Sequence, residues 1–119
     1  MAISRVTPRA RQGTTGISEE TNVTAGNGVV LFPPDRIAAV TVAVHIPAGK
    51  TGTYKIETSC NRPETIGDNG AGGYWDNPYG AGVTLSEDAV LMIANAVTAI
   101  RVTVTATNAA DGLNVCFVG

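Results

Sequence analysis

The residues that could do chemistry are few, and their spacing does not assemble a catalytic site. The single histidine, His45, lies between Val44 and Ile46 on what we expect to be the outer face of a strand. A general base needs a nucleophile within hydrogen-bond reach, and no Ser or Cys motif supplies one. The sequence has no GxSxG, no HExxH and no Gly-rich phosphate loop that opens a helix. We therefore expect a non-enzymatic protein with no catalytic residue and no cofactor, with His45 exposed or in an interface.

The two cysteines, Cys60 and Cys116, are too few for a metal quartet and have no CxxC or His-rich neighbourhood. Strand alternation places Cys60 on the inward face of its strand and Cys116 on the outward face. A disulfide needs Cβ atoms that approach to about 4 Å, which residues on opposite faces do not reach unless a bulge shifts the phase. We expect two free thiols.

A glycine-rich loop carries four oxygen-bearing side chains, those of Asp68, Asn69, Asp76 and Asn77. Calcium needs about six to eight oxygens on a preorganised loop, and this spacing matches no EF-hand. Asp and Asn are also ordinary turn residues. We expect turns here and no metal site.

The same loop holds the aromatic residues Tyr74, Trp75 and Tyr79. Rings on a sandwich loop can stack on sugars, which would make this a carbohydrate- or receptor-binding module. Alternatively, Trp75 closes one end of the core or anchors a subunit interface, where Trp and Tyr are favoured. We prefer the second interpretation, and the first stays open.

Charge is distributed unevenly along the chain. Residues 1–12 carry three arginines and no acid, whereas the remainder carries five basic and ten acidic residues. A basic arm on an acidic body could contact nucleic acid or an acidic neighbouring subunit. Without interleaved aromatic residues or another basic cluster, nucleic acid is the weaker interpretation. The candidate partner-binding residues are Arg5, Arg9, Arg11, Trp75 and Tyr79.

The chain divides into an extended N-terminal arm, residues 1–27, and a body, residues 28–119. The arm contains Pro8 and scattered apolar residues without helical or strand period, so we expect it to be ordered only against a partner. No apolar run is long enough for a membrane span, and none follows the basic N-terminus as in a secretory signal. We expect synthesis in a cytoplasm.

Short strands separated by turns follow in the body. Alternation is clearest in 38–46 and 98–107, which places Val42, Val44, Ile100, Val102 and Val104 in the core. Further strands are expected at 29–32, 53–60, 83–85, 89–94 and 113–117, with 38–46 and 53–60 forming a hairpin and Ile56 also in the core. The run 89–94 also fits a single helical turn, but the β context favours a strand. Residues 61–82 form a long loop, with a possible short strand near Tyr74.

The pattern predicts an all-β protein, an antiparallel β-sandwich that is jelly-roll-like or related, with a small barrel as the alternative. Charged residues make up only 15% of the chain, below the roughly 25% of an average domain. Outward Ala43, Cys116 and Val118 add apolar surface. We therefore expect a symmetric homo-oligomer, either a dimer or a trimer.

A Thr-rich β body with few charges, a flexible arm and stretches such as 52–57 and 98–104 resembles the small accessory virion proteins of tailed bacteriophages, which include capsid decoration (cement) proteins. The resemblance covers residues 29–119 and carries over no site residue. It implies a virion structural protein that binds assembled capsid subunits, with a tail or head–tail component as the alternative.

Overall fold

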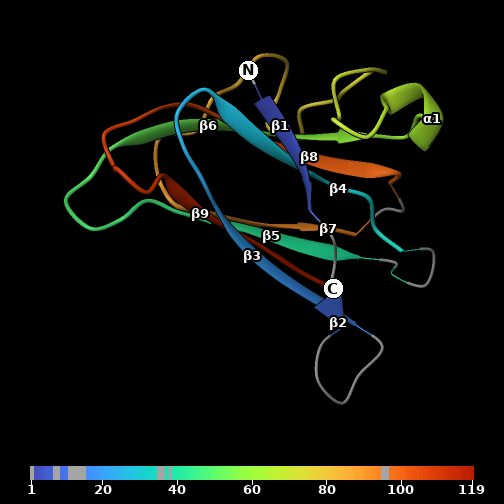
Figure 1. Cartoon of the computed structure of the whole chain (residues 1–119), viewed down its shortest axis with the longest axis horizontal. Helices are drawn as coiled ribbons and strands as arrows, with labels where there is room; N and C mark the ends of the chain where they lie inside the picture. The colour runs from blue at the N-terminus through green and yellow to red at the C-terminus, as the bar shows by residue number, and fades with distance from the viewer. Residues whose placement is uncertain (1, 7–8, 11–15, 35–36, 38, 95–96) are drawn as a thin grey trace.

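The computed structural model describes residues 2–6, 9–10, 16–34, 37, 39–94 and 97–119. Two sheets lie face to face, and Figure 1 shows them as an upper and a lower layer. The four-stranded sheet has the order β1 (Ala2–Val6), β4 (Asn27–Leu31), β8 (Ala99–Thr107), β6 (Gly52–Ser59). The five-stranded sheet has the order β2 (Arg9–Ala10), β3 (Ile17–Val23), β9 (Leu113–Val118), β5 (Val40–His45), β7 (Ala89–Ile93). Apart from the parallel β1–β4 pair, the neighbours are antiparallel, so the all-β sandwich is confirmed.

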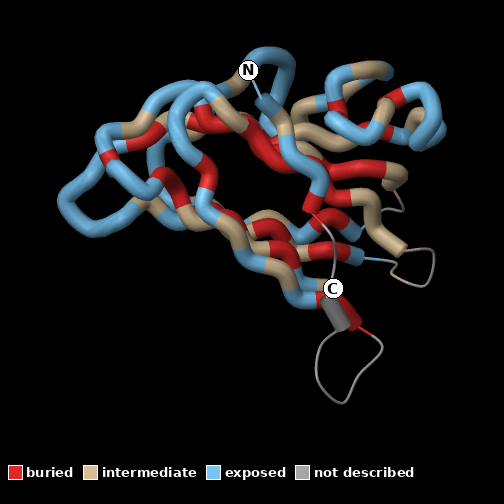
Figure 2. Tube along the Cα trace, viewed as in Figure 1, coloured by how far each residue is buried: buried red, intermediate tan, exposed pale blue. Residues whose placement is uncertain are grey.

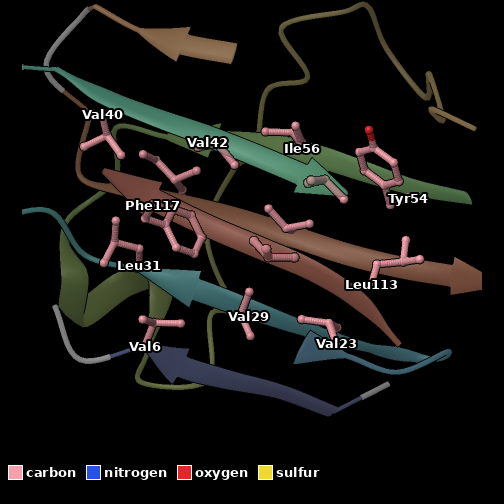
Figure 3. Close-up of a cluster of buried hydrophobic side chains, with 14 of the residues drawn as sticks. Val6, Val23, Val29, Leu31, Val40, Val42, Tyr54, Ile56, Leu113 and Phe117 are labelled. Carbon is pink, nitrogen blue, oxygen red and sulfur yellow. The ribbon is translucent and has the colours of Figure 1, made fainter. Parts of the chain in front are cut away.

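The core fills the space between the two layers, where the buried stretches of both sheets face each other (Figure 2). Inward residues alternate along each strand, as the pleat requires. The expected core residues are all fully buried: Val42, Val44, Ile56, Ile100, Val102 and Val104. Phe117 of β9 lies among side chains of both sheets in Figure 3.

The expected division into an arm and a body is wrong for the described residues of 1–27. β1 pairs with β4, and β3 pairs with β9 over six residues, so both are strands of the body. Val6 and Val23 point into the same cluster as Val29 (Figure 3), and Ile17 is 1% exposed. The interior positions of β3 are polar, so its apolar residues stand only at its ends and the local period is hidden.

The expected hairpin of 38–46 with 53–60 is also wrong, although both segments are strands. β5 pairs with β9 and β7, whereas β6 pairs with β8 in the other sheet. The chain therefore crosses between layers after Ile46. Alternation fixes which residues face inward, but a strand with one apolar face fits either layer of a sandwich equally well.

The segment between β6 and β7 is irregular, as expected, but it contains a short helix, α1 (Pro63–Ile66). Two isolated bridges tie the segment to β6, one between Thr58 and Asp76 and one between Tyr54 and Leu85. The strand expected at 83–85 is reduced to the second bridge. β7 itself is a strand and not a helical turn.

Candidate functional site

The two outer faces of the sandwich differ in what covers them. Over the four-stranded sheet, a second buried cluster combines Val30 of β4, Ala99 of β8 and Ile66 of α1, with Phe32 and Trp75 packed against it. The α1 segment and the loop that follows it therefore cover this outer face. Thr103 lies on the same face and is only 5% exposed, because its methyl group occupies the space above Gly28, which has no side chain.

Arg101 of β8 attaches this covering loop to the sheet. Its guanidinium lies 4.1 Å from the centre of the Trp75 ring, donates to the Gly70 carbonyl at 2.8 Å and pairs with Glu57 at 2.9 Å. The Arg101 and Glu57 side chains are 14% and 19% exposed. Trp75 Nε1 donates to the Gly72 carbonyl. We call these contacts the Arg101 clamp.

The aromatic residues of the loop thus have different roles. Trp75 turns its ring to Arg101 and packs on the second cluster, so it covers the outer face of a sheet and does not close one end of the main core. Tyr74 is 84% exposed, and Tyr79 is 40% exposed near Tyr54. A sugar-stacking surface needs a free ring face, and Trp75, the largest of the three rings, is engaged within its own chain.

The three arginines expected to bind a partner are not gathered on a free arm. Arg5 lies on β1, pairs with Asp68 at 3.3 Å and stands 4.8 Å from the centre of the Phe32 ring. Its side chain is still 54% exposed. Arg9 is the first residue of strand β2, and Arg11 lies outside the described residues.

Three of the four oxygen-bearing loop residues take part in local structure. Asn69 accepts a hydrogen bond from the Ala71 N–H, and Asn77 accepts one from the Tyr79 N–H, which is how Asx turns form. Asp76 pairs with β6 through its backbone. In the described part of the chain no group of three or more His, Cys, Asp or Glu residues could hold a metal ion.

His45 of β5 and Tyr54 of β6 make structural contacts. His45 is exposed, as expected, with Nδ1 3.6 Å from Asp88, which also accepts from the Ile46 N–H at 2.8 Å. Tyr54 is buried and donates its hydroxyl to the Glu87 carbonyl. Burial raises the pKa of Tyr54 to about 12, with smaller contributions from Tyr79 and Asp88.

Both cysteines are free thiols, as expected, but one is placed differently. β6 ends at Ser59, so Cys60 leaves the ladder and is exposed, not inward. Cys116 faces outward on β9 and donates to Asn114. Burial raises the pKa of the Cys116 thiol, and the nearby Glu20 carboxylate raises it further.

The outer face of the five-stranded sheet carries two rows of uncharged, mostly apolar residues across three strands. The register places Met92 beside Thr41 and Thr41 beside Val118, and in the next row it places Val90 beside Ala43 and Ala43 beside Cys116. We call these six residues the apolar face. Val90 is 67% exposed, Met92 65% and Val118 37%.

Polar residues border the apolar face on β3 and at one end of β9. Asn114 donates to Glu20 at 2.7 Å and to Asn22 at 3.1 Å. The apolar residues therefore gather towards β7 and the polar network towards β3. The sequence indicated outward Ala43, Cys116 and Val118 but not Val90 or Met92. Because both faces of the run 89–93 are apolar, nothing in it marked the outward one.

No helix in the described residues is long and apolar enough to cross a membrane. Comparison of the chain with models of protein families, with curated proteins and with solved structures found no match.

Proposed function

We propose that this protein is a non-enzymatic structural protein of a phage particle that binds an assembled lattice of protein subunits, with capsid decoration as the preferred role. The observation that carries the proposal is the apolar face. Val90 and Met92 are about two-thirds exposed and lie beside Ala43 and Thr41 on a continuous sheet surface. Contiguous apolar area on a folded protein marks an interaction site.

The composition of this surface favours a protein partner. Interfaces between proteins have a core poor in charge and enriched in residues such as Met, with a polar rim. The apolar face has no charged member, and Glu20, His45 and Asn114 stand around it as such a rim. A sheet surface of this kind matches another broad protein surface better than it matches a small ligand, which needs a concave site.

The proposal does not depend on a free arm, because residues 2–6 pair with β4. Arg5 remains on the surface of the four-stranded sheet, away from the apolar face, and can contact a second lattice subunit. Two contacts on different subunits would favour assembled lattice over isolated subunits, because the second contact becomes intramolecular.

The test is co-sedimentation of the purified chain with phage capsids that lack it and, separately, with tails. Val118→Lys adds a charge to the apolar face, and Ala81→Lys adds the same charge to an exposed turn as a matched control. We expect capsid binding by the wild type and by Ala81→Lys, and at least tenfold weaker binding by Val118→Lys. Binding to tails alone would make the protein a tail component. Equal binding by both variants would show that the apolar face is not the binding surface. Absence of binding to either particle would overturn the proposal, and a glycan array would then test the carbohydrate-binding interpretation.

A further inference from the structure

Within the described residues, β7 is an edge strand whose outer side pairs with no other strand. It stands last in the order of the five-stranded sheet, and no strand of the described chain pairs with it opposite β5. The outer edge of a strand presents backbone N–H and C=O groups that can pair with another strand. The chemistry of this edge therefore selects one kind of occupant, an extended backbone.

The other sheet edges are protected. The bridges to Asp76 and Leu85 cover β6, and β1 carries the charged Arg5. β2 is only two residues long and pairs with Ile17 and Ser18 alone, and the part of β3 beyond it carries the charged Glu19 and Glu20. Cover, shortness and charge are devices by which proteins prevent edge pairing.

β7 has none of these devices. Its five residues, Ala-Val-Leu-Met-Ile, include no charge and no proline, and its register with β5 runs without a bulge. Among the large non-aromatic hydrophobic residues of the described chain, its outward side chains Val90 and Met92 are the most exposed.

We propose that two copies of this chain pair through β7, antiparallel about a two-fold axis at Leu91, and form one continuous ten-stranded sheet. In this register Val90 of each copy lies opposite Met92 of the other, and Ala89 lies opposite Ile93. The four outward side chains then contact one another beside the axis, as directly opposed residues do in an antiparallel pair. A second copy fits because the same strand supplies both halves of an isologous contact.

The charges at the end of the strand select this arrangement. Glu87 and Asp88 immediately precede β7. A parallel pairing would place the Asp88 carboxylates of two copies side by side. The antiparallel register places Asp88 opposite the partner's Ala94, and the two Asp88 residues then stand six positions apart along the strands, or about 20 Å. No like charges are opposed.

The inner side of the edge has room for the added strand. A groove of about 350 Å³ lies between β7 and the segment that covers β6, lined by Asp76 and Pro78 on one side and by Leu91 and Ile93 on the other. Alternate side chains of a strand added beside β7 point to this side. In the proposed register the partner's Leu91 and Ala89 lie opposite Leu91 and Ile93, so these two side chains can enter the groove.

The size of the contact sets the expected affinity. Stable complexes bury roughly 800 Å² per partner, and a pairing of five residues with two exposed side chains per copy falls below that value. We expect a dissociation constant of about 1–100 μM, in the range of weak complexes. The dimer itself does not depend on lattice binding. Its consequence for the lattice, two apolar faces side by side, rests on the proposed function.

Sedimentation velocity of the full chain from about 1 to 300 μM tests the dimer without any lattice. We expect a reversible monomer–dimer equilibrium, a dissociation constant raised at least tenfold by Met92→Lys, and no such change in Val118→Lys, which lies on the same face but away from the edge. A wild-type monomer at all concentrations overturns the proposal, as does equal weakening by both variants, because that result indicates face-to-face packing.

Cross-linking tests the register independently of stability. In a Cys60→Ser, Cys116→Ser background, Val90→Cys and Met92→Cys chains are oxidised separately and as an equimolar mixture, after circular dichroism has confirmed that they are folded. We expect a disulfide-linked dimer in the mixture and little in either chain alone, because position 90 faces position 92 of the partner. Equal cross-linking in all three samples excludes the register. A monomer that still co-sediments with capsids refutes the dimer alone, whereas a dimer that binds no particle refutes the proposed function alone.

Discussion

The Arg101 clamp offers the sharpest test of how the covering loop is held. Arg101 contacts Trp75, Glu57 and the Gly70 carbonyl, and its side chain is mostly buried. Replacing it with Met keeps much of the aliphatic stem and removes the charge. Glu57 then retains a mostly buried carboxylate without its cation, and Trp75 loses the group that covers its ring.

The magnitude follows from these contacts. Removing one partner of a buried ion pair costs about 3–5 kcal/mol, because the other charge is left uncompensated. A cation–π contact adds about 1–2 kcal/mol when it is shielded from water. The Glu57 side chain is still 19% exposed, and Arg101 Nε is buried without a hydrogen-bond partner in the described chain. The ion pair therefore stabilises the fold less than a fully buried and fully hydrogen-bonded pair would. We therefore expect Arg101→Met to lower the free energy of unfolding by about 3 kcal/mol.

Urea denaturation followed by the fluorescence of Trp75, the only tryptophan, measures this change and also reports the ring's own environment. The double variant Arg101→Met, Glu57→Gln should recover part of the loss, since it removes the unpaired charge. Asp68→Asn is the matched control. It breaks the exposed pair with Arg5, in which Asp68 is 96% exposed, and should leave stability nearly unchanged.

Two results would refute this reasoning. A loss of less than about 1 kcal/mol in Arg101→Met would mean that the clamp is no stronger than a surface ion pair. An unchanged Trp75 emission spectrum in the folded variant would mean that the ring does not depend on Arg101 for its position.

Three further results are expected. Ile100→Ala should lower the free energy of unfolding by about 2–5 kcal/mol in chemical denaturation, because it leaves a cavity in the main core. Gly112→Ala should prevent stable folding or cost more than about 3 kcal/mol, since an added Cβ would clash with the Val23 carbonyl. Gly49→Ala, with a similar positive φ but no atom within 4 Å of the added Cβ, should cost only about 1 kcal/mol. Burial raises the pKa of Tyr54 from its ordinary 10.0 to about 12, so folding favours the neutral phenol. This contribution to stability, about 3 kcal/mol, is fully present below pH 10 and is lost as the pH rises to 12, and Tyr54→Phe should therefore show a shallower fall in stability over that range.

The sequence by itself determined most strands of residues 28–119 and their inward faces, although the strand expected at 83–85 is only a bridge. A period of two leaves only one face for the core, so the alternation in 98–107 identified Ile100, Val102 and Val104 without knowledge of their neighbours. The same alternation predicted that both cysteines are free thiols, which is correct. The inward position predicted for Cys60 is wrong, because its strand ends one residue earlier, at Ser59. Periodicity is a local property, and these features depend on little else.

The tertiary structure decided which strands are neighbours and which outer face is covered. β3 belongs to the body through its ladder with β9, about ninety residues away in the chain, and β5 and β6 lie in different sheets. Arg101 contacts Trp75 although the two residues belong to different segments of the chain, and no sequence pattern links them. Met92 joins Val118 in one surface only because β5 lies between them. Backbone pairing between distant segments sets all of these contacts, and a polar strand such as β3 leaves no trace of that pairing in its own residues.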